Sequence, residues 1–259
     1  MTSRLKKAIL HMLARKDSGV RLAGDYHRHG DVVTLTHAFY GPLHLFYNDA
    51  GISRWLFDGN TIWEQDIVEL FRKHFPRGRN VVDAGANLGL HTIALAQMAH
   101  HNEMVYAFEP HPEVYELTAA NCSRLANIKC FNKALSDSTR VFHMPSVKQA
   151  TNAGGGNLAE NSTSGRYAVE SILLDDLNIP NVGLMKIDVE GHEGACIRGA
   201  QKTILRDKPV LVVEIMGGTC RETATSEVVA RIDRQIDEIR DLGYSCEQAS
   251  PHDYLFVPA

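Results

Sequence analysis

The sequence predicts an α/β fold in which a doubly wound, mainly parallel sheet carries helices on both faces. From Asn80 onward, short apolar runs alternate with segments of helical pattern, as is typical of such a sheet. Near the end of the chain, two apolar runs at 244–249 and 254–259 follow each other without a helix between them. Because a parallel pair needs a long crossover, these two strands are expected to pair antiparallel.

The individual elements follow from local pattern. Strands are expected at 81–84, 104–108, 128–132, 184–188 and 210–215. Helices are expected at 90–99, which is rich in strong helix formers, at 112–126, which has a proline in its first turn, and at 194–206. A fourth helix, 226–243, has a buried stripe formed by Val228, Ile232, Ile236 and Ile239, and Gly243 ends it.

Length and composition indicate one large domain with an extension. The chain has 259 residues, 44% of them hydrophobic and 22% charged, enough to bury a sizeable core. We divide it into an N-terminal extension of a helix and short strands, 1–79, and a core domain, 80–259. A polar stretch rich in Gly, Ser and Asn, about 137–170, interrupts the alternation, and an insertion of this length is usually functional or mobile.

Charge and cysteine usage exclude several classes of protein. The net charge of −4 does not suggest a nucleic-acid partner. The first 30 residues are locally basic, but their apolar run is too short to span a membrane, so we expect a solvated amphipathic helix and no stable membrane insertion. Five dispersed cysteines without a CxxC pair fit buried thiols and a cytoplasmic location.

The stretch VVDAGANLGLHT is the first chemical signal. A strand ends near Asp83, and Gly85, Asn87 and Gly89 precede a helix, so the turn is tight and a ligand can approach the backbone. Glu109 closes the next strand, where a carboxylate can accept both hydroxyls of a ribose. The acidic Asp83 suits the cationic end of S-adenosylmethionine better than the pyrophosphate of a dinucleotide. A turn that binds no ligand is the alternative.

A second cluster of titratable groups lies in LMKIDVEGHEG, where the strand 184–188 ends. Asp188, Glu190 and His192 are expected to line one rim together with Glu214 from the following strand, because ligands bind outside the carboxyl ends of parallel strands. Each has a structural alternative. In these alternatives, Glu190 caps the following helix or bonds loop amides, Glu193 only favours a helix start, Lys186 pairs with a neighbouring carboxylate, and His192 is a solvated surface group.

The sequence resembles the FkbM family of S-adenosylmethionine-dependent methyltransferases. The resemblance is carried by residues 81–96, 105–121, 131–137 and 172–177, and above all by LMKIDVEGHEGACIRGAQKTILRDKPVLVVEI, residues 184–215. It covers about residues 80–216, and upstream the segment FDGNTIWEQDIVELF is similar to the family's lead-in with its Trp-Glu pair. Bulkier aliphatic residues are commoner in the family where this chain has Gly194-Ala195-Cys196-Ile197, a departure that concerns local packing.

The resemblance implies a class I methyltransferase fold, Rossmann-like, with a seven-stranded sheet of order 3-2-1-4-5-7-6 and strand 7 antiparallel. It implies methyl transfer to a hydroxyl of a sugar, a glycan or a secondary metabolite, in natural product biosynthesis. The N-terminal extension would then be a cap or a contact for the acceptor or a second subunit. The cofactor-binding residues that the resemblance implies are Asp83, Gly85, Asn87, Gly89, Glu109, Asn132 and Ser136, the last two flanking the adenine.

Methyl transfer from a sulfonium is an in-line displacement, so much of the catalysis is positioning. An alcohol is a poor nucleophile at neutral pH, and we expect His192, Asp188 or Glu190 to accept its proton. A Mg²⁺ ion held by Asp188 and Glu214 is the alternative. In the insertion, Asn152, Asn157 and Asn161 are expected to bond a polyhydroxylated acceptor, with Arg166 and Tyr167 as further contacts and the glycines allowing closure as a lid.

Two other functions remain open at this stage. One is an RNA methyltransferase of the same fold, against which the acidic charge and the lack of interleaved basic and aromatic residues count. The other is a non-catalytic scaffold that binds S-adenosylmethionine, against which the intact loop and the complete KIDVEGHE stretch count. A homo-oligomer is also compatible with the sequence.

Overall fold

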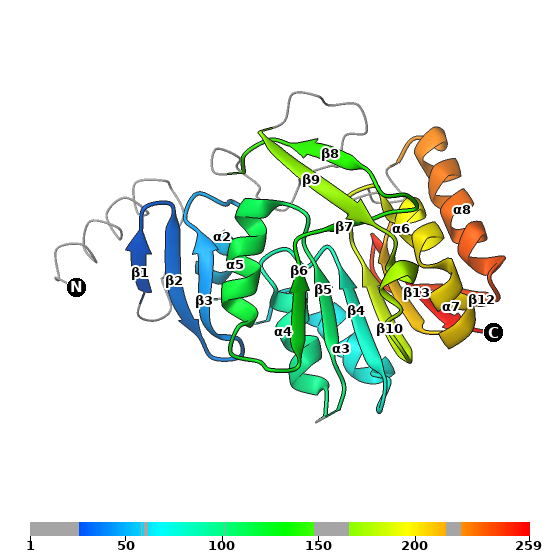
Figure 1. The fold of residues 1–259 in the computed structure, drawn as a ribbon, viewed down its shortest axis with the longest axis horizontal. Coiled ribbons are helices and arrows are strands. Elements are labelled where there is room, and N and C mark those ends of the chain that lie inside the picture. The colour runs from blue at the N-terminus through cyan, green and yellow to red at the C-terminus, as the bar shows by residue number, and fades with distance from the viewer. Residues whose placement is uncertain (1–25, 58, 60–61, 101, 148–165, 216–223) are drawn as a thin grey trace.

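The computed structural model describes residues 26–57, 59, 62–100, 102–147, 166–215 and 224–259. A seven-stranded sheet forms the centre, in the order β12-β13-β11-β10-β4-β5-β6 (Figure 1). Its strands are β4 (Asn80–Ala84), β5 (Val105–Phe108), β6 (Ile128–Phe131), β10 (Val182–Ile187), β11 (Val210–Glu214), β12 (Tyr244–Gln248) and β13 (Asp253–Pro258). Counted along the chain from β4, the order is 3-2-1-4-5-7-6. β13 pairs antiparallel with both β11 and β12, which confirms the predicted topology.

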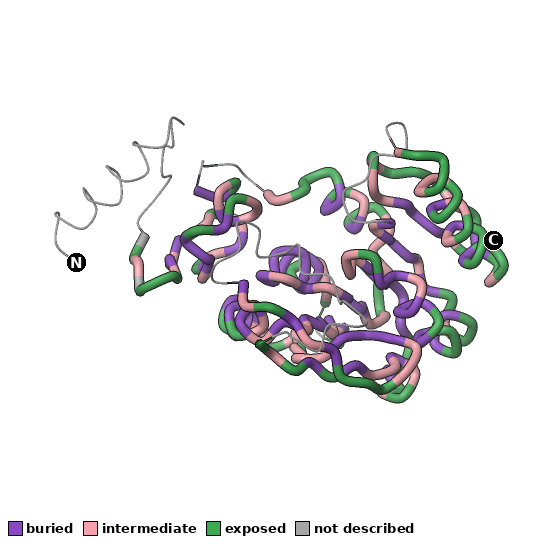
Figure 2. The backbone as a smooth tube through the Cα atoms, turned by 90° about the horizontal axis from the view of Figure 1, so that it is seen from above, coloured by how far each residue is buried: buried purple, intermediate pink, exposed green. Residues whose placement is uncertain are grey.

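Helices cover both faces of this sheet because its strands are apolar on both sides. On one face, Ile67 and Phe71 of α3 (Gln65–His74) and Leu95 of α4 (Leu90–Met98) pack on Val81 and Leu184. The other face packs against the 3-10 turn η1 (Leu174–Leu177) and the helices α6 (Glu193–Gly199), α7 (Gln201–Asp207) and α8 (Ser226–Arg240). Buried residues therefore concentrate between the layers, while outward-facing turns are exposed (Figure 2).

The first described part of the extension, residues 26–57, folds as a separate small layer, whereas α3 packs on the central sheet. β1 (Tyr26–His29), β2 (Val32–His37) and β3 (Gly41–Phe46) form an antiparallel sheet, followed by α2 (Ile52–Phe57). Its apolar face packs on α5 (Pro112–Cys122) and the start of α4. The Asn121 side chain crosses this boundary: it accepts from the amide of His44 and donates to the carbonyl oxygens of His44 and Leu88. The extension is thereby anchored beside the Gly-rich loop.

The structure corrects two expected elements. The helix expected at 194–206 is broken at Ala200, whose φ of −110° and ψ of 5° separate α6 from α7. The polar stretch 137–170 is not purely a loop, since β8 (Val141–Met144) and β9 (Tyr167–Ile172) join β7 (Ala134–Leu135) in a second three-stranded sheet (Figure 1). The predicted N-terminal helix and residues Asn152, Asn157 and Asn161 lie outside the described residues. Within the described part, no helix is both long and apolar enough to span a bilayer.

Gly199 allows α6 to approach the backbone of Ser136, which directly follows β7 of this second sheet. A Cβ atom at Gly199 would lie 1.9 Å from the carbonyl oxygen of Ser136, a backbone atom that cannot rotate away. We expect Gly199→Ala to lower the free energy of unfolding by about 1–3 kcal/mol through overpacking. Gly194→Ala in the same helix is the matched control, since its nearest neighbour is the flexible end of Arg198 at 3.2 Å.

Denaturant unfolding of both variants measures this difference. The control should stay close to the parent protein, because alanine is the better helix former. Equal stability of the two variants would show that the contact between α6 and Ser136 is looser than described.

Two joined cavities form a candidate active site

The Gly-rich loop brings the ends of two central strands into contact. Gly85 has a φ of +81°, and a Cβ atom there would lie 1.7 Å from the carbonyl oxygen of Asp188, so a larger residue would separate β4 from the end of β10. Asn87 and Gly89 also have positive φ values, of +48° and +83°. These three residues turn the chain from β4 directly into α4, as the glycine pattern predicts.

A buried ion network lies beneath this loop. The ammonium of Lys186 lies 3.4 Å from Asp83 Oδ1 and 3.2 Å from Asp188 Oδ2, and it donates to the carbonyl oxygen of Gly85 at 2.8 Å. Burial alone would lower the pKa of Lys186, but the charges of Asp188 and Asp83 outweigh it and raise this pKa above its ordinary value. The pairing of Lys186 with a carboxylate is confirmed. Asp83 is fully buried under the loop, accepts from Thr92, and lines neither cavity described below.

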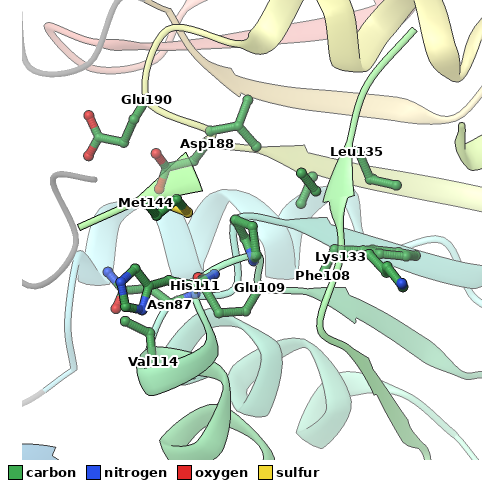
Figure 3. Close-up of a pocket in the computed structure, with 15 residues that line it drawn as sticks. Asn87, Phe108, Glu109, His111, Val114, Lys133, Leu135, Met144, Asp188 and Glu190 are labelled. Carbon is green, nitrogen blue, oxygen red and sulfur yellow. Dashed lines mark hydrogen bonds between the residues drawn. The ribbon is translucent and has the colours of Figure 1, made fainter. Parts of the chain in front are cut away.

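The first cavity lies over the carboxyl ends of β4 and β5 and encloses about 690 Å³ of space, part of it open to solvent (Figure 3). Its apolar wall is formed by Phe108, Val114, Leu135 and Met144. Its polar groups include Gly85, Asn87, Glu109, Asp188 and Glu190.

Glu109 is the best-held of these polar groups. Its two carboxylate oxygens accept from the backbone amides of Asn87, at 2.9 Å, and His111, at 2.8 Å. Burial raises the pKa of Glu109 to about 7, although the two backbone hydrogen bonds lower it. These two hydrogen bonds hold the carboxylate at the wall of the cavity. Its remaining lone pairs can accept hydrogen bonds from the hydroxyl groups of a ligand.

Asn132 and Ser136, which were expected to flank the adenine, make other contacts. The side-chain amide of Asn132 donates to the carbonyl oxygens of Glu109 and Pro110, both at 2.9 Å, and so shapes the loop after β5. Ser136 is fully buried, with its hydroxyl 3.0 Å from His192 Nε2. Neither residue lines the first cavity, whose wall is formed instead by Lys133, Ala134 and Leu135, the residues between them in the sequence.

The second cavity continues from the first on the side of the N-terminal extension. It encloses about 730 Å³ of partly open space. Its titratable groups are Glu64, His91, Lys186, Asp188, Glu190 and Glu214. Gly85, Asn87, Asp188 and Glu190 line both cavities, so the two spaces meet at these residues. A ligand in the first cavity can therefore present one end to a molecule in the second.

The carboxylates at this junction have strongly shifted pKa values. Burial, then the charges of Asp188 and Glu193, raise the pKa of Glu190 to about 7. Burial, then a hydrogen bond with Asp188, raise that of Glu214 to about 10. Burial would raise the pKa of Asp188 as well, but Lys186 and Glu214 hold it below the usual range. Asp188 and Glu214 thus share one proton at neutral pH, while Glu190 is poised to gain or lose one.

The same three carboxylates are close enough to share a cation. One oxygen each from Asp188, Glu190 and Glu214 lies within 4.8 Å of the other two. Oxygen ligands of this kind suit Mg²⁺. The sequence analysis named Asp188 and Glu214 as possible ligands of this ion, and the structure adds Glu190 as a third.

His192 lies away from both cavities. Its ring is buried, with Nε2 facing the Ser136 hydroxyl and the ring edge-on to Phe142 at 5.5 Å. Its expected place on the rim with Asp188 and Glu190 is therefore corrected. The cause is the turn at Glu190 and Gly191, whose φ values of +51° and +89° redirect the chain before α6 begins.

Three residues of the second cavity did not stand out in the sequence as site residues. Glu64 precedes α3 with a φ of +44°, and its Oε2 lies 3.4 Å from Nε2 of His91 on α4. Trp63 lines the same cavity. The Trp-Glu pair in the lead-in segment was a usable sequence signal for Trp63 and Glu64. His91, in the first turn of a helix, had no such signal.

Tyr167, expected as an acceptor contact, instead donates to Glu113 at 2.9 Å, which ties the second sheet to α5.

Comparison with known proteins gives one family match. The profile described as "Methyltransferase FkbM domain" matches residues 83–246 of the chain. The hexuronic acid methyltransferase AglP of Haloferax volcanii is 27% identical over 160 residues, which cover 60% of this chain and 63% of that protein. The chain thus matches slightly under two thirds of the length of this relative.

Two solved structures align with parts of this chain. A methyltransferase FkbM from Methylobacillus flagellatus aligns with a TM-score of 0.47 and 17% identity, over 69% of this chain and 43% of that one. Fibrillarin from Aeropyrum pernix, described as natively bound to S-adenosyl-L-methionine, aligns with a TM-score of 0.49 and 11% identity, over 92% and 98%. Both TM-scores are below 0.5, so neither likeness bears on function.

The titration of Glu214 predicts how stability varies with pH. Its pKa rises from an ordinary 4.5 to about 10 on folding, so between these values the folded protein holds a proton that the unfolded chain releases. Stability therefore falls as pH rises through this window. We expect the melting temperature of the ligand-free protein to decrease from about pH 7 to about pH 9, and Glu214→Gln, which cannot titrate, to reduce the decrease.

Differential scanning fluorimetry across this range makes the measurement, with Glu116→Gln on the exposed face of α5 as the control. An identical pH slope in the parent protein and Glu214→Gln would contradict the shared proton.

Proposed function

This chain belongs to the FkbM methyltransferase family, and we propose that it moves a methyl group from S-adenosylmethionine to a hydroxyl of a sugar, glycan or secondary metabolite. One observation carries the proposal. A cavity with a fixed carboxylate and an apolar wall meets a second cavity lined by carboxylates, and Asp188 and Glu190 line both. A donor and an acceptor placed in the two spaces would meet at these residues.

The first cavity suits the nucleoside part of the donor. In this arrangement the ribose hydroxyls bind Glu109, and the adenine packs among Phe108, Leu135 and Met144. Gly85 and Asn87 would hold the methionine part of the donor, and Asp188 would lie beside its sulfonium. A negative side chain there complements the positive charge of the donor. Asp83 and Lys186 support this site from below without touching the donor.

Glu190 is the proton acceptor in this mechanism. An alcohol needs to lose its proton as the methyl group transfers, and a base with a pKa near neutrality suits this step. Glu190 lies where the cavities meet and has its pKa raised to about 7. The acceptor oxygen attacks the methyl carbon, the C–S bond breaks in line, S-adenosylhomocysteine leaves, and the proton passes to the Glu190 carboxylate.

Ile52, Trp63 and Glu64 of the extension line the second cavity, so we place acceptor contacts in residues 1–79 as well as in the core. Acceptor specificity then resides partly outside the segment 83–246 that defines the family. Loops and added segments commonly carry specificity on a shared fold.

Replacement of Glu190 tests the mechanism. We expect Glu190→Gln to lower kcat by at least about 100-fold, because the base is lost, and Glu190→Asp to retain part of the activity. S-adenosylhomocysteine should bind both variants within about threefold of the parent protein, as measured by calorimetry. In the parent protein, kcat/KM should decrease as pH falls below about 7, where Glu190 becomes protonated.

Transfer is measured with labelled S-adenosylmethionine against sugars and glycosylated metabolites, with mass detection of the product. Parent-like turnover by Glu190→Gln would contradict the assigned base. Absence of any S-adenosylmethionine binding would contradict the proposed function itself and favour a non-catalytic role.

Removal of divalent metal with EDTA distinguishes catalysis by Glu190 as a base from catalysis assisted by Mg²⁺. If Asp188, Glu190 and Glu214 act through Mg²⁺, activity is lost in EDTA and returns with added Mg²⁺. If Glu190 acts as a base alone, EDTA leaves the rate unchanged. The second result is expected here, because Asp188 and Glu214 already bind each other through a shared proton.

A further inference from the structure

We infer that the second cavity binds a sugar ring that carries no carboxylate, with one face of the ring against Trp63. This rests on the proposed function and specifies its acceptor. The inference combines two independent features of the cavity. One is an aromatic side chain at its wall that packs against a second indole, and the other is an excess of negative charge that, among the described lining residues, meets no unpaired permanent cation.

Trp63 is anchored by its surroundings. Its backbone amide donates to the hydroxyl of Tyr40 at 3.1 Å, and Tyr40 is fully buried. Its ring meets the ring of Trp55 edge-to-face, with 5.7 Å between centroids and an angle of 90°. Trp55 is itself 42% exposed, unusual for so large an apolar side chain. Trp63 therefore lines the cavity on the side that faces the extension, and Trp55, which does not line it, packs against the Trp63 ring.

An aromatic side chain at the wall of a cavity suits a pyranose ring. The face of an indole carries negative partial charge, and it attracts the weakly positive C–H groups on one face of a sugar. The hydroxyls at the ring edge can then reach Glu64 and Glu190, whose carboxylate oxygens accept hydrogen bonds. A preformed apolar surface with a few polar groups around it is the usual design of a small-molecule site.

The charge of the cavity decides against a uronic acid. Its wall contains four carboxylic groups. Asp188 is ionised at neutral pH, and Glu64 and Glu190, whose pKa values burial raises to about 7, are partly ionised, whereas Glu214 holds a proton. Among the described residues that line it, Lys186 is the one permanent cation, and Asp83, Asp188 and the carbonyl of Gly85 already occupy its ammonium. Burial lowers the pKa of His91 to about 4, so this imidazole is neutral.

A carboxylate on the acceptor would therefore face like charges without a counterion, which is unfavourable at close range. The relative from Haloferax volcanii is described as a hexuronic acid methyltransferase, so the two proteins are expected to differ in acceptor.

The chain offers a direct reporter for this inference, because Trp55 and Trp63 are its only two tryptophans. The protein is loaded with S-adenosylhomocysteine and titrated with the methyl glycosides of glucose, galactose and mannose, and with the matching hexuronates. Tryptophan emission and saturation-transfer NMR follow binding. We expect at least one neutral glycoside to change the emission and to bind about tenfold or more tightly than its hexuronate.

Variants assign the effect to the proposed groups. Trp63→Phe should remove most of the emission change and weaken glycoside binding, while Trp55→Phe keeps the Trp63 signal. Glu64→Gln should reduce the difference in affinity between a neutral glycoside and its matching hexuronate. High salt should have the same effect, because both changes weaken the repulsion of the hexuronate carboxylate. A purely structural role of Glu64 would weaken both members equally.

Failure of this inference and failure of the proposed function are distinguishable. Absence of S-adenosylhomocysteine binding in calorimetry overturns the proposed function. Normal binding of that nucleoside, together with hexuronates that bind as tightly as neutral glycosides, overturns only the inference. Normal nucleoside binding with no response to any glycoside in either readout overturns it as well.

Discussion

One buried ammonium group organises the site. Lys186 is almost completely enclosed, and its charge is balanced by Asp83 and Asp188 and shared with the carbonyl oxygen of Gly85. These partners belong to β4, to the end of β10 and to the loop between β4 and α4. Breaking a buried pair of this kind leaves an uncompensated charge in a medium that solvates it poorly. The loop is therefore held in place against the strand ends by charge as well as by shape.

This constraint explains why the two cavities meet where they do. Gly85 has to be glycine because the Asp188 carbonyl occupies the place of a side chain. Since Lys186 holds Asp188 from below, the Asp188 carboxylate stays ionised and accepts the proton of Glu214, while Glu190 remains free at the junction. The position of the proposed base thus depends on a lysine that takes no part in the chemistry.

Much of this arrangement could be predicted from sequence, because the signals were periodic or backbone-determined. Alternating apolar strands and helices predicted the doubly wound sheet and its antiparallel final pair, and the family resemblance implied the sheet order. Glycines with a following acid predicted a ligand-binding loop, and Gly85, Asn87 and Glu109 do line the first cavity. What failed was side-chain direction. His192 lies two residues from Glu190, yet two successive positive φ values turn it toward Ser136. Asn132 and Ser136 flank the cavity wall in sequence but point into the protein.

Residues brought in from a distant part of the chain were the hardest to predict. Glu64 and Trp63 reach the cavity only because the extension packs on α5 and α4, a contact between segments with no shared pattern. Pairings of this kind depend on three-dimensional docking, such as the Asn121 contact with the carbonyl oxygens of His44 and Leu88. The acceptor side of the site is therefore the part that structure adds to the sequence analysis.

A double-mutant cycle tests the central role of Lys186 most directly. It compares Lys186→Met, Asp83→Asn and the double variant with the parent protein. For each protein, calorimetry gives the affinity for S-adenosylhomocysteine and denaturant unfolding gives the stability. We predict that Lys186→Met weakens binding at least about tenfold and destabilises the fold by about 3–5 kcal/mol, and that adding Asp83→Asn restores part of the stability. Unchanged affinity and stability in Lys186→Met would contradict the account.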